Sequence, residues 1–145
     1  MPSLLSALLV QDRVVSFRQM DAAVRAQQRD GGHIGTCLLE LGAIDEGILL
    51  YYESKARQVP SADRDAFANI PRAAVEAVDS AWALRHKACP VGFDGDALLV
   101  AAVEPLSSEA LEELGCPAHE RVGLELRVMQ ALQALYGAPL DPRLA

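Results

Sequence analysis

An internal repeat in the first 57 residues constrains the fold most. Each copy reads as a short apolar helix, a tight connection, an apolar pair and a second helix. Two helical hairpins in tandem, residues 1–57, are therefore the predicted first unit. A shift of 29 positions superposes Leu5 on Ile34, Leu9 on Leu38, Val10 on Leu39, Val15 on Ile44 and Met20 on Leu49.

Local signals mark where the second helix of each hairpin begins. Ser16 with Gln19 three residues later has the form of a capping box, and Asp45 is placed as the N-cap in the second copy. The pair Gly31 and Gly32 ends the first of these helices. Helical spacing predicts Phe17, Met20, Val24 and Gln27 on one side of this helix, with Arg18, Arg25 and Arg29 facing water.

The remainder of the chain predicts a small α+β subdomain. Residues 58–78 read as a connecting segment followed by a short helix from Pro71, residues 79–137 as the subdomain, and residues 138–145 as a loose tail. Residues 88–93 and 97–103 read as a β-hairpin whose Asp94-Gly95 turn supplies positive φ angles. Residues 121–126 read as a third strand and residues 128–136 as a final helix. The predicted fold class is α+β, with a three-stranded sheet flanked by helices.

Charge and composition narrow the classes of partner. The net charge is −7, with six basic and seven acidic residues in 1–57 and seven basic and thirteen acidic residues in 58–145. An acidic chain gives no electrostatic reason to bind nucleic acid or an anionic membrane. The apolar runs are too short to insert into a membrane and the N-terminus lacks a basic signal region, so we expect a cytoplasmic protein. Three widely spaced cysteines predict neither a disulfide framework nor a zinc site.

Candidate catalytic residues are sparse, and the chain is predicted not to be an enzyme. Phosphate-binding loops, zinc-protease helices and nucleophile elbows do not occur in the sequence. The histidines lie far apart, without metal-ligand spacing, and Trp82, Cys37 and Cys89 read as core residues. Glu109, Glu112 and Glu113 read as a solvated helix face rather than as paired catalytic carboxylates, and they are a candidate surface for a basic patch on a partner.

Several segments together resemble a known family. They are the repeat unit in residues 33–44, the Asp-Gly hairpin, the strand-Glu-Pro-Leu-helix step in residues 97–106, and the closing segment 131–137. Their order resembles the N-terminal domain of type II secretion and type IV pilus assembly ATPases, of the GspE and MshE type, over residues 4–137. The nucleotide-hydrolysing domain that normally follows is absent from the sequence, so the resemblance does not imply ATPase activity.

The resemblance implies two roles: docking onto an inner-membrane partner and, in the MshE type, binding cyclic di-GMP through both repeats. The family's Arg-Leu-Gly corner is Leu4-Leu5-Ser6 in the first repeat and His33-Ile34-Gly35 in the second, so both arginines that would pair with phosphate are lost. The closing glutamine is kept as Gln27 and replaced by Ala56. The residues expected to bind cyclic di-GMP, if any do, are Gln27, His33, Ile34 and Gly35.

Three interpretations stay open at this point. The main one is a non-catalytic adaptor that binds a protein component of a secretion, pilus or motility system, itself cytoplasmic and recruited to the inner membrane through that component, with no cofactor. The alternative is a cyclic di-GMP sensor with a degenerate motif. A piece of a longer ATPase is the third. Plain structural roles compete at each site residue, because Gly35 also permits close helix packing and Gln27 suits a solvated helix face.

Overall fold

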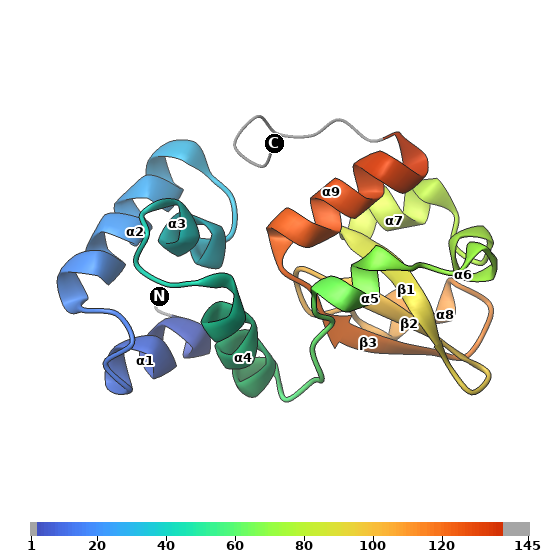
Figure 1. Ribbon diagram of the computed structural model, residues 1–145, viewed down its shortest axis with the longest axis horizontal. Coiled ribbons are helices and arrows are strands. Elements are labelled where there is room, and N and C mark those ends of the chain that lie inside the picture. The colour runs from blue at the N-terminus through green and yellow to red at the C-terminus, as the bar shows by residue number, and fades with distance from the viewer. Residues whose placement is uncertain (1–2, 138–145) are drawn as a thin grey trace. The chain divides into compact units, whose positions relative to one another are not determined.

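The computed structural model describes residues 3–137, and the chain folds into two compact units with a boundary between Gln58 and Val59. The first unit is helical, and the second contains the sheet (Figure 1). No described helix has the length and apolar character needed to cross a membrane.

The first unit consists of two hairpins with the same connection. They are formed by α1 (Leu4–Gln11) with α2 (Phe17–Asp30), and by α3 (Ile34–Glu40) with α4 (Glu46–Arg57). In the first connection the N–H groups of residues 12, 13 and 14 donate to the carbonyls of residues 8, 10 and 9. In the second, those of residues 41, 42 and 43 donate to residues 37, 39 and 38. Every bond is displaced by the 29 positions of the sequence repeat, so the predicted tandem hairpins are confirmed.

Each connection places one residue in the left-handed backbone region. That residue is Arg13 (φ 59°) in the first hairpin and Gly42 (φ 70°) in the second. A left-handed residue with a Cβ costs about 1–2 kcal/mol, whereas glycine adopts this conformation freely. The first hairpin therefore tolerates strain that the second avoids.

Replacing Arg13 with glycine is expected to raise the free energy of unfolding by up to about 1 kcal/mol, because relieved strain outweighs the added entropy of the unfolded chain. Replacing Gly42 with alanine is expected to lower it by about 1 kcal/mol, since alanine is strained at that φ. Urea denaturation followed by circular dichroism at a helical wavelength measures both. Shifts of the same sign for the two variants would contradict the shared left-handed geometry.

The helix α2 begins as predicted, but its buried face is rotated from the predicted one. Ser16 accepts from the Gln19 N–H (3.1 Å) while its own N–H donates to the Gln19 side chain (2.8 Å), a complete capping box. Of the residues predicted to share one side of α2, Met20 is buried, whereas Phe17 is 80% exposed. The buried residues are Met20, Ala23 and Ala26. Ala23 lies roughly 120° around the helix from Phe17, and its small side chain allows close helix packing.

The sheet of the second unit has the strand order β1-β2-β3. The strands β1 (Ala88–Asp94) and β2 (Ala97–Ala102) form the predicted antiparallel hairpin, although only Gly95 in its turn has positive φ (60°). The third strand, β3 (Ala118–Val122), begins three residues earlier than predicted and pairs parallel to β2. The bond from the Leu98 N–H to the Pro117 carbonyl extends this pairing to the residue before β3. The final helix correspondingly begins before residue 128.

Helices cover the sheet, and one of them lies in a segment that was predicted only to connect. Asp63 caps the unpredicted helix α5 (Arg64–Ala68) by accepting from the Ala66 N–H (3.2 Å). The chain just before it pairs with β3, because the Ala62 N–H donates to the Val122 carbonyl (2.8 Å). The helices of this unit are α5 (Arg64–Ala68), α6 (Arg72–Glu76), α7 (Ser80–His86), α8 (Ser108–Glu112) and α9 (Glu125–Tyr136).

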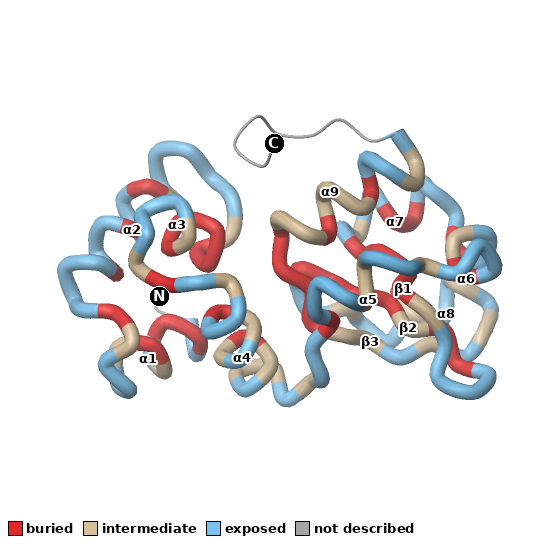
Figure 2. The backbone as a smooth tube through the Cα atoms, viewed as in Figure 1, coloured by how far each residue is buried: buried red, intermediate tan, exposed pale blue. Residues whose placement is uncertain are grey.

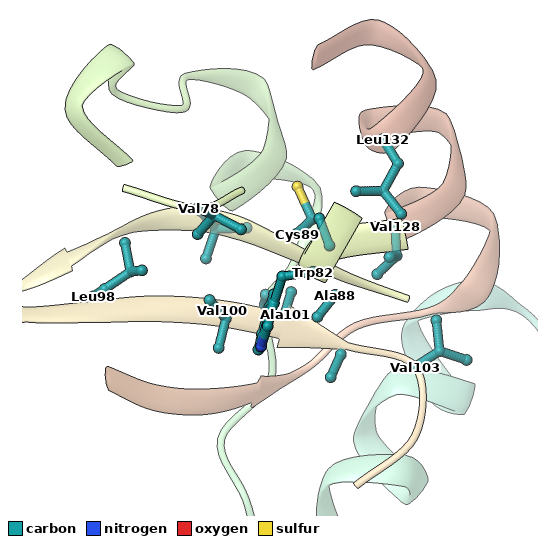
Figure 3. Packing of buried hydrophobic residues seen from close by; sticks show 14 of the residues in the cluster. Val78, Trp82, Ala88, Cys89, Leu98, Val100, Ala101, Val103, Val128 and Leu132 are labelled. Atoms are coloured by element: carbon teal, nitrogen blue, oxygen red, sulfur yellow. The ribbon is translucent and has the colours of Figure 1, made fainter. Parts of the chain in front are cut away.

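The hydrophobic core of the second unit lies between the sheet and these helices. Buried segments run along β1 and β2 and along one side of α7 and α9 (Figure 2). Trp82 and Cys89 are buried as predicted and lie together with Val100, Val128 and Leu132 (Figure 3). The indole N–H of Trp82 donates to the buried Ala110 carbonyl at 2.9 Å, which ties α7 to α8.

Candidate functional site

A pocket of about 480 Å³ lies in the first unit between α1, α2 and α3. Two of the four predicted ligand residues, Gln27 and Ile34, line it. Every lining residue is neutral, so the pocket offers no charged side chain to a dianionic ligand. The remaining lining residues are Ser3, Ser6, Met20, Val24 and Gln28.

Three polar residues of this pocket, Ser3, Ser6 and Gln27, already form hydrogen bonds within the chain. The Gln27 side-chain amide donates to the Gly32 carbonyl (3.1 Å), which holds the turn after α2. The hydroxyl groups of Ser3 and Ser6 lie 3.0 Å apart, and the Ser3 hydroxyl also accepts from the Ser6 N–H as the cap of α1. A ligand that used these groups would exchange existing hydrogen bonds for new ones, which limits the gain in affinity.

The other two predicted residues, His33 and Gly35, have structural roles beside α4. His33 caps α3 by accepting the Gly35 N–H on Nδ1 (3.0 Å), so the ring proton lies on Nε2, 3.3 Å from Glu53 Oε1. A Cβ at Gly35 would come within 3.0 Å of Leu49 Cδ2, so glycine permits the close packing of α3 on α4. His33 would have to give up this helix cap to bind a phosphate.

Glu53 is a buried site residue that the sequence reasoning missed. Its side chain is 7% exposed and faces the His33 imidazole. The signal was available, because Glu53 follows the buried Leu49 by four residues and therefore lies on the same face of α4.

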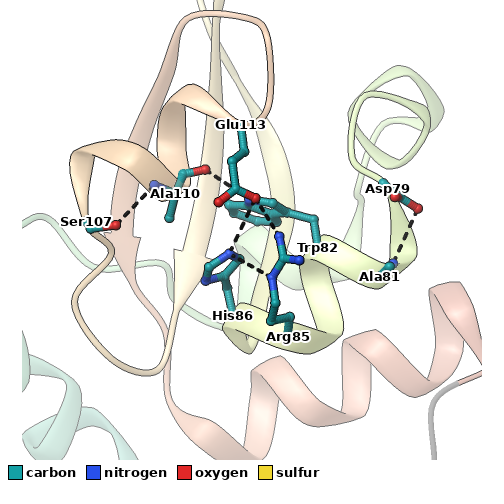
Figure 4. A network of polar contacts seen from close by, with 8 residues as sticks. All are labelled: Asp79, Ala81, Trp82, Arg85, His86, Ser107, Ala110 and Glu113. Atoms are coloured by element: carbon teal, nitrogen blue, oxygen red, sulfur yellow. Dashed lines mark hydrogen bonds and ion pairs between the residues drawn. The ribbon is translucent and has the colours of Figure 1, made fainter.

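The acidic cluster on α8 is partly neutralised within the second unit. Glu109, Glu112 and Glu113 are all exposed, in agreement with a solvated face. Glu113 pairs with Arg85 and lies 4.0 Å from His86 Nε2 (Figure 4). Glu109 and Glu112 are therefore the acidic side chains on this face most available to a partner.

The cysteines differ in their access to solvent and in their chemistry. Cys37 and Cys89 are buried, whereas Cys116 is partly exposed. Burial raises the pKa of the Cys89 thiol to about 12, which leaves almost no reactive thiolate at neutral pH. Between residues 3 and 137 no group of three or more metal-ligating side chains gathers around a common point.

The thiol reagent DTNB at about pH 8, near the ordinary cysteine pKa, is expected to react promptly with the partly exposed Cys116 of the folded protein. The buried Cys37 and Cys89 are expected to react only after unfolding. Because the Cys89 pKa is raised in the folded state, its stabilising contribution is present below the unfolded-state pKa of about 8.5 and is lost as the pH rises toward about 12. Rapid reaction of two thiols without denaturant would contradict the burial of Cys37 and Cys89.

Comparison with known proteins places this architecture in a family. The MshEN domain model matches residues 57–142, more than half of the chain. The chain belongs to the MshEN domain family. The matched residues coincide with the second unit of this MshEN domain, so the helical repeats lie almost entirely outside the match.

Two relatives extend the similarity to the helical unit. The type IV pilus assembly ATPase PilB of Myxococcus xanthus (strain DK1622) is 30% identical over 136 residues, which cover 91% of this chain and 24% of PilB. The structure of MshE with cdg, that is cyclic di-GMP, is 26% identical with a TM-score of 0.65 and covers 94% of this chain and 100% of the other.

A third relative agrees with the fold alone. The N-terminal domain of XpsE has a TM-score of 0.61 at 20% identity and covers 92% of this chain and 96% of the other. The present MshEN domain thus has the fold of secretion-ATPase N-terminal domains, and it spans about a quarter of the length of the curated relative.

Proposed function

We propose that this MshEN domain is a non-catalytic interaction module, a protein adaptor in a secretion, pilus or motility system. The observation that supports it most is the similarity over 91% of the chain to only 24% of a pilus assembly ATPase. The chain thus corresponds to the part of that ATPase that has the MshEN fold. We further propose that it acts in the cytoplasm and reaches the inner membrane through its partner.

The exposed carboxylates of Glu109 and Glu112 on α8 are one proposed docking surface, for a basic patch on a partner. The experiment is chemical crosslinking and pull-down of the tagged chain from native lysate, followed by mass spectrometry. Recovery of a secretion, pilus or motility component is expected, and recovery of none would refute the adaptor role.

The role of the acidic face is tested by E109Q/E112Q in the same experiment. Reduced capture is expected, whereas the matched control E76Q, at an exposed glutamate paired with Arg72 on α6, is expected to capture normally. Equal capture by E109Q/E112Q and wild type would exclude this face and leave the adaptor role to another surface.

The second candidate function is a cyclic di-GMP sensor. It is favoured by the structure of MshE with cdg and by the pocket that brings Gln27 and Ile34 together. The missing motif arginines and the neutral lining argue for weak binding at most. Isothermal titration with about 100 μM protein detects micromolar binding. Heat that is lost in the Q27A variant would support the sensor, and no heat at this concentration would end that interpretation.

A further inference from the structure

A second groove of about 480 Å³ lies at the α1–α2 connection and shares no lining residue with the pocket around Gln27. Val10 and Val14 line it and are half-buried, and Phe17, the first residue of α2, is 80% exposed beside them. An aromatic ring so exposed buries little of its apolar surface within the unit, and such surface is typical of sites that contact another molecule. The groove therefore offers an apolar floor to solvent.

Two arginines lie at or beside this groove. Arg13 lines the groove and Arg18 follows Phe17 on the exposed side of α2. Neither guanidinium forms a hydrogen bond or ion pair with any residue between Ser3 and Gly137. The neighbouring carboxylate of Asp12 is occupied elsewhere, by the Tyr52 hydroxyl (2.8 Å) and Lys55 (3.9 Å).

Two other arginines of α2 form ion pairs. Arg25 pairs with Asp21 at 2.6 Å and Arg29 with Asp30 at 3.2 Å. Because Arg13 and Arg18 have no ion-pair partner among residues 3–137, they give this groove a local positive charge in a chain whose net charge is −7. Its charge is complementary to carboxylates.

The second repeat shows that the fold does not require these residues. At the positions of Arg13, Phe17 and Arg18, a shift of 29 residues places Gly42, Glu46 and Gly47. The second hairpin forms the same hydrogen-bonded connection with those residues. Arg13 is thus kept in a left-handed conformation that glycine would adopt without strain, and its side chain lines the groove.

We propose that the groove formed by Val10, Arg13, Val14 and Phe17, together with Arg18, docks an acidic segment of a protein partner. An aromatic or aliphatic side chain of that segment packs on Val14 and Phe17, and flanking carboxylates pair with Arg13 and Arg18. The inference rests on the proposed adaptor function and adds a surface whose charge is opposite to that of α8.

Selection of random short peptides displayed on phage, with the full chain as bait, tests the chemistry without a known partner. Enriched peptides are expected to carry an apolar residue flanked by Asp or Glu. A labelled copy of the most enriched peptide is then titrated by fluorescence anisotropy. F17S and R13G are each expected to weaken its binding by about tenfold or more, and added salt is expected to weaken wild-type binding.

Matched controls separate docking from folding. R13G is expected to stabilise the first hairpin, so lost binding in that variant cannot come from unfolding. F93S removes an aromatic that is 44% exposed on β1, and R72Q removes an exposed arginine on α6, and both are expected to bind as wild type. Enriched peptides without acidic residues, or equal binding by F17S, R13G and wild type, would overturn the proposal.

Failure of the groove proposal can be distinguished from failure of the adaptor role. If wild type, F17S and R13G capture the same component of a secretion, pilus or motility system equally in the pull-down, the groove is not the docking site, while the adaptor role is supported. If wild type captures no component while the selected acidic peptide binds at the groove, the adaptor role fails and the groove stands. Binding to phosphatidylglycerol vesicles that is lost in R13G, without acidic peptide enrichment, would replace the protein partner by an anionic membrane.

Discussion

Replacing Trp82 with alanine is expected to lower the free energy of unfolding of the second unit by about 3–5 kcal/mol, the usual range for deleting a buried aromatic side chain. Trp82 is 4% exposed and packs in the main core cluster of this unit. Its loss leaves a cavity and also leaves the buried Ala110 carbonyl without its indole donor. Both effects lower the free energy of unfolding.

Urea denaturation followed by far-ultraviolet circular dichroism measures the change, because Trp82 is the single tryptophan and its fluorescence disappears with it. W82F keeps most of the ring volume but loses the hydrogen bond, so an intermediate loss is expected. L84A, at a residue 40% exposed on the same helix, is the matched control and is expected to change stability little. A W82A variant as stable as L84A would show that Trp82 does not anchor the core.

Replacing Gly123 with alanine is expected to lower stability by about 1–3 kcal/mol, because an added methyl group overpacks the junction between β3 and α9. A Cβ at this position would come within 2.6 Å of Val128 Cγ2 and 3.0 Å of the Ala101 Cβ. The backbone has little freedom to withdraw, since the Gly123 N–H donates to the Ala102 carbonyl at 3.0 Å.

Gly92 provides the comparison for this substitution. A Cβ at Gly92 would meet no heavy atom within 4 Å in the described part of the chain, and its φ is not positive. G92A is therefore expected to leave the thermal midpoint nearly unchanged, while G123A lowers it by several degrees. Equal midpoints for the two variants would contradict the close contact at Gly123.

Local signals in the sequence predicted much of the fold. The capping box at Ser16, the cap at Asp45 and the turn at Gly95 each act within a few residues, and the structure confirms the hairpins that they imply. The offset of 29 residues predicted that the two hairpins share one kind of connection, and the structure places Arg13 and Gly42 at the same position of it.

These local signals did not predict the contacts between segments that lie far apart in the sequence. The parallel register of β3 depends on the partner strand, and residues 118–122 carry no strong alternation of their own. The spacing of large apolar residues along α2 identified Met20 but not Ala23 and Ala26, because small residues at a helix contact do not stand out in a hydrophobic periodicity. At the candidate site, Gln27 and Ile34, two residues to which the family resemblance pointed, line one pocket, whereas the His33–Glu53 contact depends on the packing of α3 on α4.

The parallel pairing of β2 with β3 is expected to be a slow step in the folding of the second unit. Its strands are separated by the connection through α8, so the chain must close a long loop before the pairing contributes any stability, whereas the helical hairpins form from neighbouring residues. Until β3 docks, the apolar strand β2 keeps one edge open to other chains. Refolding at low protein concentration should therefore recover more native protein than refolding at high concentration.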